Sequence, residues 1–339
     1  MNPLVSILIP AYNAERWIAD TIKSALEQTW SNKEIVVVDD GSRDQTLEIA
    51  RRFASSNVCV TGQENQGAAA ARNKALELCK GNYIQWLDAD DILAPDKIQK
   101  QLATVEEENL STSTLLSGPW AYFYHRTKAA KFSPTPLWCD LSPAEWLVTK
   151  WNHNLHMQTA TWLVSRELTE AAGPWDCRLF SNDDGEYLCR VIKASNAIKF
   201  VADAKMFYRM TGSTRLSHIG QSMPKTEAQL LGMQLQIAHV RSVEDSPRTR
   251  AACVKFLQTW LLQFYPERMD LVAQIQDMAA SLGGRVHTPS LSWKYAWISR
   301  CFGLTAAKRV RSWYNWRKVT MLKTLSLLAQ EFDTMRNSR

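Results

Sequence analysis

Apolar residues follow two different spacings along the first 110 residues. Short runs rich in Val, Ile and aromatic residues have the length of buried strands, and the stretches between them repeat apolar residues at helical spacing. The predicted strands are residues 4–9, 34–38, 58–60 and 83–87, and the predicted helices are residues 14–28, a stretch ending near 53, 67–79 and 95–108. Strand–helix alternation predicts an α/β fold with a mostly parallel central sheet flanked by helices.

The pattern changes after residue 110, where short strands and helices follow one another irregularly. Strands are predicted at 114–117, 120–124, 197–201 and 205–210, and helices at 145–150, 166–172 and after residue 182. A polar loop is predicted at residues 212–222. From residue 224 onward the sequence predicts helices, with breaks near 245–247, 265–266 and 282–284. We therefore expect three parts, comprising residues 1–110, residues 111–222 and a helical C-terminal region over residues 223–339.

Carboxylates gather where two of the predicted strands end. They are Asp39 and Asp40 after the strand at 34–38, and Asp88, Asp90 and Asp91 after the strand at 83–87. Open α/β sheets bind ligands at the carboxyl ends of their strands, and alternation would point Asp88 and Asp90 to the same side. A hard divalent cation bound together with substrate phosphates would relieve the repulsion between them. The alternative is an acidic loop in which Asp91 caps the next helix.

Arg72 and a third acidic segment add candidate groups. Arg72 lies one or two turns into the helix at 67–79, whose N-terminal end favours anions, and a solvated surface arginine is the alternative. Asp183 and Asp184 lie at a predicted helix start, where an acid could cap the helix or act as a general base. The chain has neither G-x-G-x-x-G after its first strand nor G-x-x-x-x-G-K-[ST], which disfavours a Rossmann dinucleotide site and a P-loop.

Five motifs occur in a fixed order in the first hundred residues. They are Pro10-Ala11-Tyr12-Asn13, Val38-Asp39-Asp40-Gly41-Ser42, Asn65-x-Gly67 to Ala71-Arg72-Asn73, Gly81-Asn82-Tyr83-Ile84 and Leu87-Asp88-Ala89-Asp90-Asp91. In order and spacing they resemble the family 2 glycosyltransferases, which have the GT-A fold. The resemblance is close over residues 3–100 and looser to about residue 212. It implies that residues 1–110 bind a nucleotide sugar and that residues 111–222 bind the acceptor.

The resemblance also implies an inverting transferase that uses a nucleotide-diphosphate sugar and Mn²⁺ or Mg²⁺. The residues that would line the donor site are Pro10, Tyr12, Asp40, Arg72 and Asp88. The segment Asp88-Ala89-Asp90 looks like the D-x-D of the family, so Asp90 would be the main metal ligand and Asp88 would lie near both the metal and the ribose. Asp39, beside Asp40, is a further candidate for this site.

On the acceptor side, Asp183-Asp184 stands where the family usually has Glu-Asp, so Asp184 would be the general base and Asp183 its neighbour. The Q-x-x-R-W signature of processive members is absent, which favours transfer of a single sugar. Arg209 could bind donor phosphate or acceptor, with a structural surface pair formed with Tyr208 as the alternative. His156 falls where an acceptor-side loop would be, and no further Cys or His nearby supports a metal site there.

Composition and charge indicate the compartment and the kind of surface that the chain would contact. It has seven cysteines without a C-x-x-C pair, which favours a reducing compartment, and no basic leader or apolar run long enough for a membrane span is evident. The formal net charge is +6, yet residues 278–330 alone hold nine Lys and Arg and no Asp or Glu. Tryptophans interleave with these cations, which suits an anionic membrane surface contacted through residues 285–330; the alternative is a helical subdomain with a solvated basic face.

We therefore expect a cytoplasmic glycosyltransferase, peripheral at the inner face of the cell membrane, that acts on a glycan or lipid-linked acceptor in cell-envelope or exopolysaccharide synthesis. No nucleic-acid partner is expected. Two alternatives remain open at this point. One is a non-catalytic protein that binds a sugar nucleotide or glycan as an assembly partner. The other is a nucleotidyltransferase, which would share the sheet and the paired acids.

Overall fold

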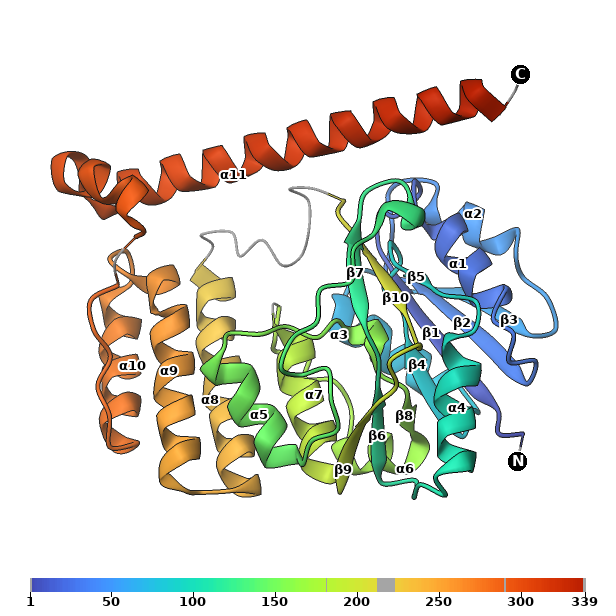
Figure 1. Cartoon of the computed structure of the whole chain (residues 1–339), viewed down its shortest axis with the longest axis horizontal. Helices are drawn as coiled ribbons and strands as arrows, with labels where there is room; N and C mark the ends of the chain where they lie inside the picture. Colours follow the sequence, from blue (N-terminus) through green and yellow to red (C-terminus); the bar gives the residue numbers. More distant parts are fainter. Residues whose placement is uncertain (1, 181, 212–222, 290, 338–339) are drawn as a thin grey trace.

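The computed structural model of the chain describes residues 2–180, 182–211, 223–289 and 291–337 (Figure 1). In its first part, strands and helices alternate as the sequence predicts. The elements are β1 (Val5–Ala11), α1 (Ile18–Leu26), β2 (Lys33–Asp39), α2 (Thr46–Arg51), β3 (Val58–Gly62), α3 (Ala68–Leu78), β4 (Tyr83–Trp86), β5 (Ile92–Leu93) and α4 (Lys97–Glu107).

The central sheet has the strand order β3-β2-β1-β4-β8. Its first four strands are parallel, and β8 (Val164–Ser165) pairs antiparallel with β4. In the centre of the sheet, Leu8 of β1 lies opposite Val36 of β2 on one side and Trp86 of β4 on the other. The mostly parallel sheet is therefore confirmed, and its β1, β2 and β4 strands end at one edge.

The second part adds smaller sheets beside the central one. Strands β5, β10 and β7 form one sheet, and β6 pairs with β9. The elements are β6 (Thr114–Ser117), β7 (Trp120–Phe123), η1 (Thr127–Ala129), α5 (Pro143–Asn152), η2 (Thr159–Thr161), α6 (Arg166–Ala172), α7 (Asp183–Ala194), β9 (Ala197–Phe200) and β10 (Met206–Arg209). The polar loop predicted for residues 212–222 lies outside the described residues.

Both faces of the central sheet are buried, because its strands are apolar at consecutive positions. Ile7 and Ile9 belong to the hydrophobic cluster that includes α1 and α4, whereas Leu8 belongs to a second cluster on the opposite face. This second cluster continues through α7 into the C-terminal helices, where it includes Met233 and Leu257. The sheet and these helices therefore share one core.

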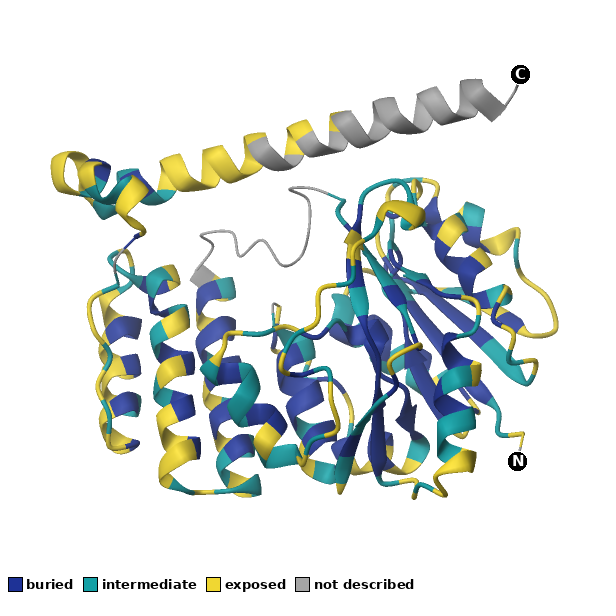
Figure 2. Ribbon diagram, in the orientation of Figure 1, coloured by how far each residue is buried: buried dark blue, intermediate teal, exposed yellow. Residues whose placement is uncertain are grey.

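Among the described residues after position 222, the chain forms four helices. They are α8 (Met223–Val243), α9 (Pro247–Phe264), α10 (Met269–Ser281) and α11 (Trp293–Asn337). Helices α8, α9 and α10 stand side by side with buried inner faces, and the three predicted breaks fall between helices (Figures 1 and 2). Gly303, with φ of 80°, divides α11 into two helical segments. Within the described residues, no helix has the length and apolar character needed to cross a bilayer.

Candidate active site

Arg72 connects two acidic segments that are far apart in the sequence. Its Nη2 lies 3.0 Å from Asp88 Oδ1 at the end of β4, and its Nη1 lies 2.6 Å from Asp183 Oδ2 at the start of α7. Only 8% of the Arg72 side chain is exposed. The arginine is therefore a buried ion-pair residue and not a solvated surface group. Asp88, for which a metal was the expected counter-charge, already has a cationic partner here.

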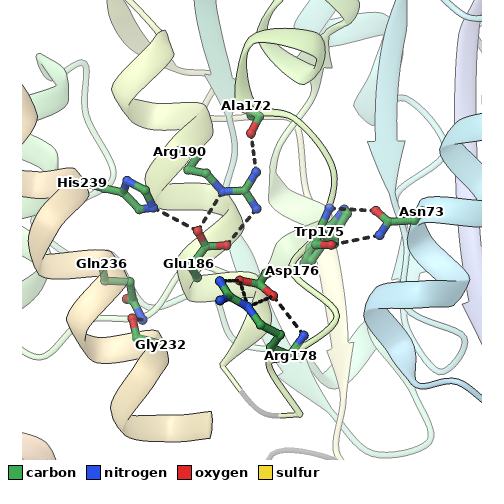
Figure 3. A network of polar contacts seen from close by, with 10 residues as sticks. All are labelled: Asn73, Ala172, Trp175, Asp176, Arg178, Glu186, Arg190, Gly232, Gln236 and His239. Atoms are coloured by element: carbon green, nitrogen blue, oxygen red, sulfur yellow. Dashed lines mark hydrogen bonds and ion pairs between the residues drawn. The ribbon is translucent and has the colours of Figure 1, made fainter.

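The guanidinium of Arg72 lies over an aromatic stack formed by Trp175 and Tyr187. The guanidinium carbon lies 4.4 Å from the centre of the Trp175 ring, which stacks on Tyr187 of α7 at 4.0 Å. Asn73 fixes Trp175 by accepting from its backbone N–H at 2.7 Å and donating to its carbonyl at 2.9 Å (Figure 3). Burial alone would lower the pKa of Arg72, but the Asp183 and Asp88 carboxylates outweigh it and raise that pKa. The guanidinium is therefore charged and held in one orientation.

The two acids after β2 have different surroundings. Asp40 accepts from Gln63 Nε2 at 2.8 Å, from the Gln66 N–H at 2.9 Å and from the Gly67 N–H at 2.8 Å. These bonds fold the segment before α3 back onto the sheet edge and so position the helix that carries Arg72. The base and ribose contact expected of Asp40 stays a prediction, because both of its oxygens already bind this segment.

Unlike Asp40, Asp39 has a carboxylate oxygen that remains available as a hydrogen-bond acceptor. Its Oδ2 accepts from the Ser42 N–H at 3.0 Å, whereas its buried Oδ1 has no hydrogen-bond partner among the described residues. A buried carboxylate oxygen without a donor is costly unless a ligand supplies one. Asp39 pairs in register with Ala11, which lies between Pro10 and the exposed Tyr12. The structure thus places Pro10 and Tyr12 on either side of the residue that pairs with Asp39, at the end of the sheet where the donor site is expected.

The acids after β4 accept hydrogen bonds from the end of β10 and from Thr211, just after it. Asp91 is buried and accepts from the Arg209 N–H at 2.9 Å, so the alternative that it caps the next helix is wrong; Asp96 precedes α4 instead. Asp90 Oδ2 accepts from the Thr211 hydroxyl at 3.1 Å. Across the part of the chain that the structure describes, no three His, Cys, Asp or Glu side chains gather as a metal cage. Carboxylate oxygens nevertheless suit Mg²⁺ or Mn²⁺ when substrate phosphates complete the coordination.

Arg209 is buried and does not form the surface pair considered above. Its guanidinium lies between the Trp17 and Phe123 rings, at 4.7 and 4.6 Å from their centres. Its Nε donates to the Asp90 carbonyl at 2.8 Å, and its Nη2 lies 3.2 Å from Asp20 Oδ2. Burial lowers the pKa of Arg209 against the raising effect of these acids. Contact with donor phosphate or acceptor would require the side chain to leave this position, so that role stays a prediction.

The two acids at the start of α7 are not simple helix caps. Asn182 precedes the helix with φ of 56° and makes no side-chain cap bond among the described residues, and Asp183 already belongs to the first turn of the helix. Burial raises the pKa of Asp183, and the Arg72 guanidinium acts against this shift. Asp184 accepts from the Gly185 N–H at 2.8 Å and interacts electrostatically with Arg72. The expected base therefore lies beside the ion pair that reaches Asp88.

His156 is an exposed residue on the loop after α5. Partial burial of its ring and the neighbouring Lys150 lower the pKa of His156, and Asp184 has the opposite effect. The imidazole therefore lies within electrostatic range of Asp184, on the side where an acceptor is expected.

Glu186 and its partners form a network that the sequence did not reveal. Arg190 donates to Glu186 through Nε and Nη2, each at 2.8 Å, and His239 Nε2 lies 3.0 Å from Glu186 Oε1 (Figure 3). Burial would raise the pKa of Glu186, but the hydrogen bonds from His239 and Arg190 lower it. The i,i+4 spacing of Glu186 and Arg190 was a visible signal of their pairing. No such signal points to His239, which comes from α8.

Comparison with known proteins identifies the part of the chain that holds Asp39, Asp40, Arg72 and the acids after β4. Residues 6–155 match the model of the family described as Glycosyl transferase family 2. One relative is the putative teichuronic acid biosynthesis glycosyltransferase TuaG of Bacillus subtilis, 42% identical over 115 residues that cover 33% of this chain and 46% of TuaG. Another is the Escherichia coli protein named UDP-Glc:alpha-D-GlcNAc-diphosphoundecaprenol beta-1,3-glucosyltransferase WfaP, 44% identical over 108 residues that cover 32% of this chain and 43% of WfaP.

The structure comparison extends beyond the matched residues. S. aureus TarS 1–349 in complex with UDP superimposes with a TM-score of 0.63 and 18% identity, covering 82% of this chain and 80% of TarS 1–349. This likeness shows the fold, and it confirms the GT-A architecture and the C-terminal helical region expected from the sequence. The chain matches less than half the length of the curated relatives named above. Within it, residues 6–155 belong to glycosyltransferase family 2.

Proposed function

We propose that this protein transfers one sugar from a nucleotide-diphosphate donor to a hydroxyl acceptor with inversion of the anomeric centre. The observation that carries this proposal is the buried Arg72, which binds Asp88 on the donor side and Asp183 next to Asp184. Through these two ion pairs, Arg72 connects the segment that carries the proposed base to the segment that carries the proposed donor ligands, which supports the proposal. Since family membership supports the chemistry for residues 6–155 only, the activity of the whole chain is part of the proposal.

For the donor, we propose a uridine diphosphate sugar, because the structural neighbour TarS carries UDP. The unpaired Asp39 Oδ1 would accept an N–H of the base, and Pro10 and Tyr12 would lie against the ring. Asp90 would hold Mn²⁺ or Mg²⁺ together with the diphosphate, since hard carboxylate oxygens fit either ion. When bound, the metal would neutralise charge that develops on the departing diphosphate.

The base chemistry belongs to Asp184. Its carboxylate takes the proton of the acceptor hydroxyl while that oxygen attacks the anomeric carbon from the side opposite the leaving group. The bond between the anomeric carbon and the diphosphate oxygen breaks, and the nucleoside diphosphate keeps the electron pair. Asp183 cannot serve equally well, because its carboxylate is bound to Arg72 at 2.6 Å. Two adjacent acids therefore have separate roles.

Replacing Asp90 with Ala should remove the metal-dependent part of donor binding. Wild-type protein with a uridine diphosphate sugar and Mn²⁺ at about 100 times the dissociation constant should gain about 2.7 kcal/mol in unfolding free energy, which a thermal-shift assay detects. The variant should show the same small shift with and without Mn²⁺. Asp96→Ala is the matched control, because that residue pairs with Lys100 on the surface of α4. A full Mn²⁺-dependent shift in Asp90→Ala would place the metal elsewhere.

We also propose a lipid-linked acceptor and a peripheral position at the inner face of the membrane. The relative WfaP is named for a diphosphoundecaprenol-linked acceptor. Helix α11 suits such a location, because it exposes 80% of Trp293, 60% of Trp297 and 55% of Trp313 among its cations. Figure 2 shows its described residues largely exposed beyond Gly303. Aromatic rings with interleaved Lys and Arg favour an anionic lipid interface.

Vesicle sedimentation tests this surface. The full chain should bind vesicles that contain phosphatidylglycerol and should not bind neutral phosphatidylcholine vesicles, and deletion of residues 285–339 should abolish binding. Arg309→Glu combined with Arg311→Glu should weaken it strongly in the intact chain, because each cation near the surface contributes about 1 kcal/mol. Arg51→Glu, on the surface of α2, is the control. Vesicle binding that survives the truncation would contradict the proposed surface.

A further inference from the structure

Helix α8 contacts α7 at the turn that carries the proposed base. Gly185, directly after Asp184, is buried; a Cβ built on it would clash with the side chain of Asn182 and would lie 3.2 Å from Gln236 Oε1 of α8. Gln236 is itself 1% exposed, and its Nε2 donates to the Gly232 carbonyl one turn earlier on α8. The missing side chain at position 185 therefore leaves room for Asn182 in the same turn and for Gln236 of α8 beside it.

A second contact follows one residue later. Glu186, whose side chain is 4% exposed, lies 3.0 Å from His239 Nε2, and the carboxylate can only accept, so the imidazole donates. Arg190 donates to both oxygens of the same carboxylate and to the Ala172 carbonyl at the end of α6 (Figure 3). Glu186 thus joins α6, α7 and α8 through charge-assisted hydrogen bonds, which are the stronger kind.

Asp184 lies between two restrained positions. On its N-terminal side, Asp183 is bound to Arg72, and on its C-terminal side Gly185 lies beside Gln236 and Glu186 binds His239 of α8. The first turn of a helix lacks internal hydrogen-bond partners for its N–H groups and frays readily. Contacts from other elements therefore decide how firmly a carboxylate at this place is oriented. Helix α8 begins at Met223, well beyond the residues that match the family model.

We propose that α8 is part of the catalytic apparatus, with His239 and Gln236 as positioning residues that hold the first turn of α7 and thereby orient Asp184. This inference rests on the proposed role of Asp184 as the base. Both residues act through α7: His239 through its hydrogen bond to Glu186, and Gln236 through its position beside Gly185. Misplacing a catalytic group by about 1 Å can cost about 10²-fold in rate, so modest loosening of this turn has a measurable effect.

The test compares His239→Ala and Gln236→Ala with Gln234→Ala, an exposed residue on the same helix. Purified full-length variants are assayed well below their unfolding temperatures with a uridine diphosphate sugar and Mn²⁺. The first two variants should lose about 10- to 100-fold in kcat, with the donor KM within about twofold of wild type. His239→Gln, whose amide can still donate to Glu186, should recover most of the lost kcat, and Gln234→Ala should match wild type.

A purely structural role for α8 predicts a different result. His239→Ala and Gln236→Ala would then lower the unfolding temperature while kcat below that temperature stayed within about threefold of Gln234→Ala. If Asp184→Asn is inactive in the same assays, that outcome would overturn the positioning role and leave the proposed function intact. Full turnover in Asp184→Asn would instead show that Asp184 is not the base. A loss of kcat that His239→Gln does not recover would also count against the hydrogen bond to Glu186.

Discussion

Replacing Asp184 with Asn is expected to lower kcat by about 10²–10⁴-fold while donor affinity stays unchanged. The amide has nearly the shape of the carboxylate, and its oxygen can still accept from the Gly185 N–H. It cannot take the proton of the acceptor hydroxyl. The change therefore removes the base chemistry and leaves Arg72 with its two carboxylate partners.

The measurement is steady-state transfer to an acceptor, combined with donor binding by thermal shift. Asp270→Asn is the matched control, because Asp270 also lies in the first turn of a helix, α10, and pairs there with Arg268. This control should keep wild-type turnover. Retained turnover in Asp184→Asn would move the base elsewhere, and His156, within electrostatic range of Asp184, would be the next residue to replace.

The sheet and its acidic edge were predictable because the physical signal is local. Strands that are buried on both faces must be apolar at consecutive positions, as in Val36, Val37 and Val38 of β2. A parallel sheet places the ends of β1, β2 and β4 at one edge, so acids that follow those strands had to lie near one another.

The different surroundings of Asp39 and Asp40 were not predictable. Neighbouring residues point in opposite directions, and which one is left open depends on the segment that folds back over the edge. Here the backbone of Gln66 and Gly67 binds Asp40, which leaves Asp39 Oδ1 without a partner among the described residues. The sequence contains these residues but gives no signal for that return path.

Contacts between distant segments were also beyond the sequence. Arg72 and Asp183 are separated by 111 positions, and no pattern within α3 shows that its arginine is an ion-pair residue. Likewise, helical spacing predicted α8 but not that Gln236 would meet Gly185. Such pairs depend on how whole elements pack, which is decided by the shared core and not by residues near them in the chain.

Replacing Arg72 with Met should reduce the unfolding free energy by about 3–5 kcal/mol, the usual cost of removing one partner from a buried ion pair. Asp183 would lose its closest cation, although burial already raises the pKa of that carboxyl even with the guanidinium present. The stack on Trp175 would lose its cation as well. Asp88 contributes less to the cost, because 33% of its side chain is exposed and water can solvate it.

Urea unfolding of four variants separates this ion pair from ordinary surface charge. Arg52→Met is the matched control: Arg52 pairs with Glu48, both are about two-thirds exposed, and the loss should be at most about 1 kcal/mol. Arg72→Lys should fall between the two, because one ammonium cannot bind two carboxylates as a planar guanidinium does. Adding Asp183→Asn to Arg72→Met should restore part of the loss, since the uncompensated buried charge is then gone. If Arg72→Met loses no more unfolding free energy than Arg52→Met, the ion pair of Arg72 with Asp183 does not stabilise the fold. The contacts that join the donor edge to the proposed base would then contribute no measurable stability.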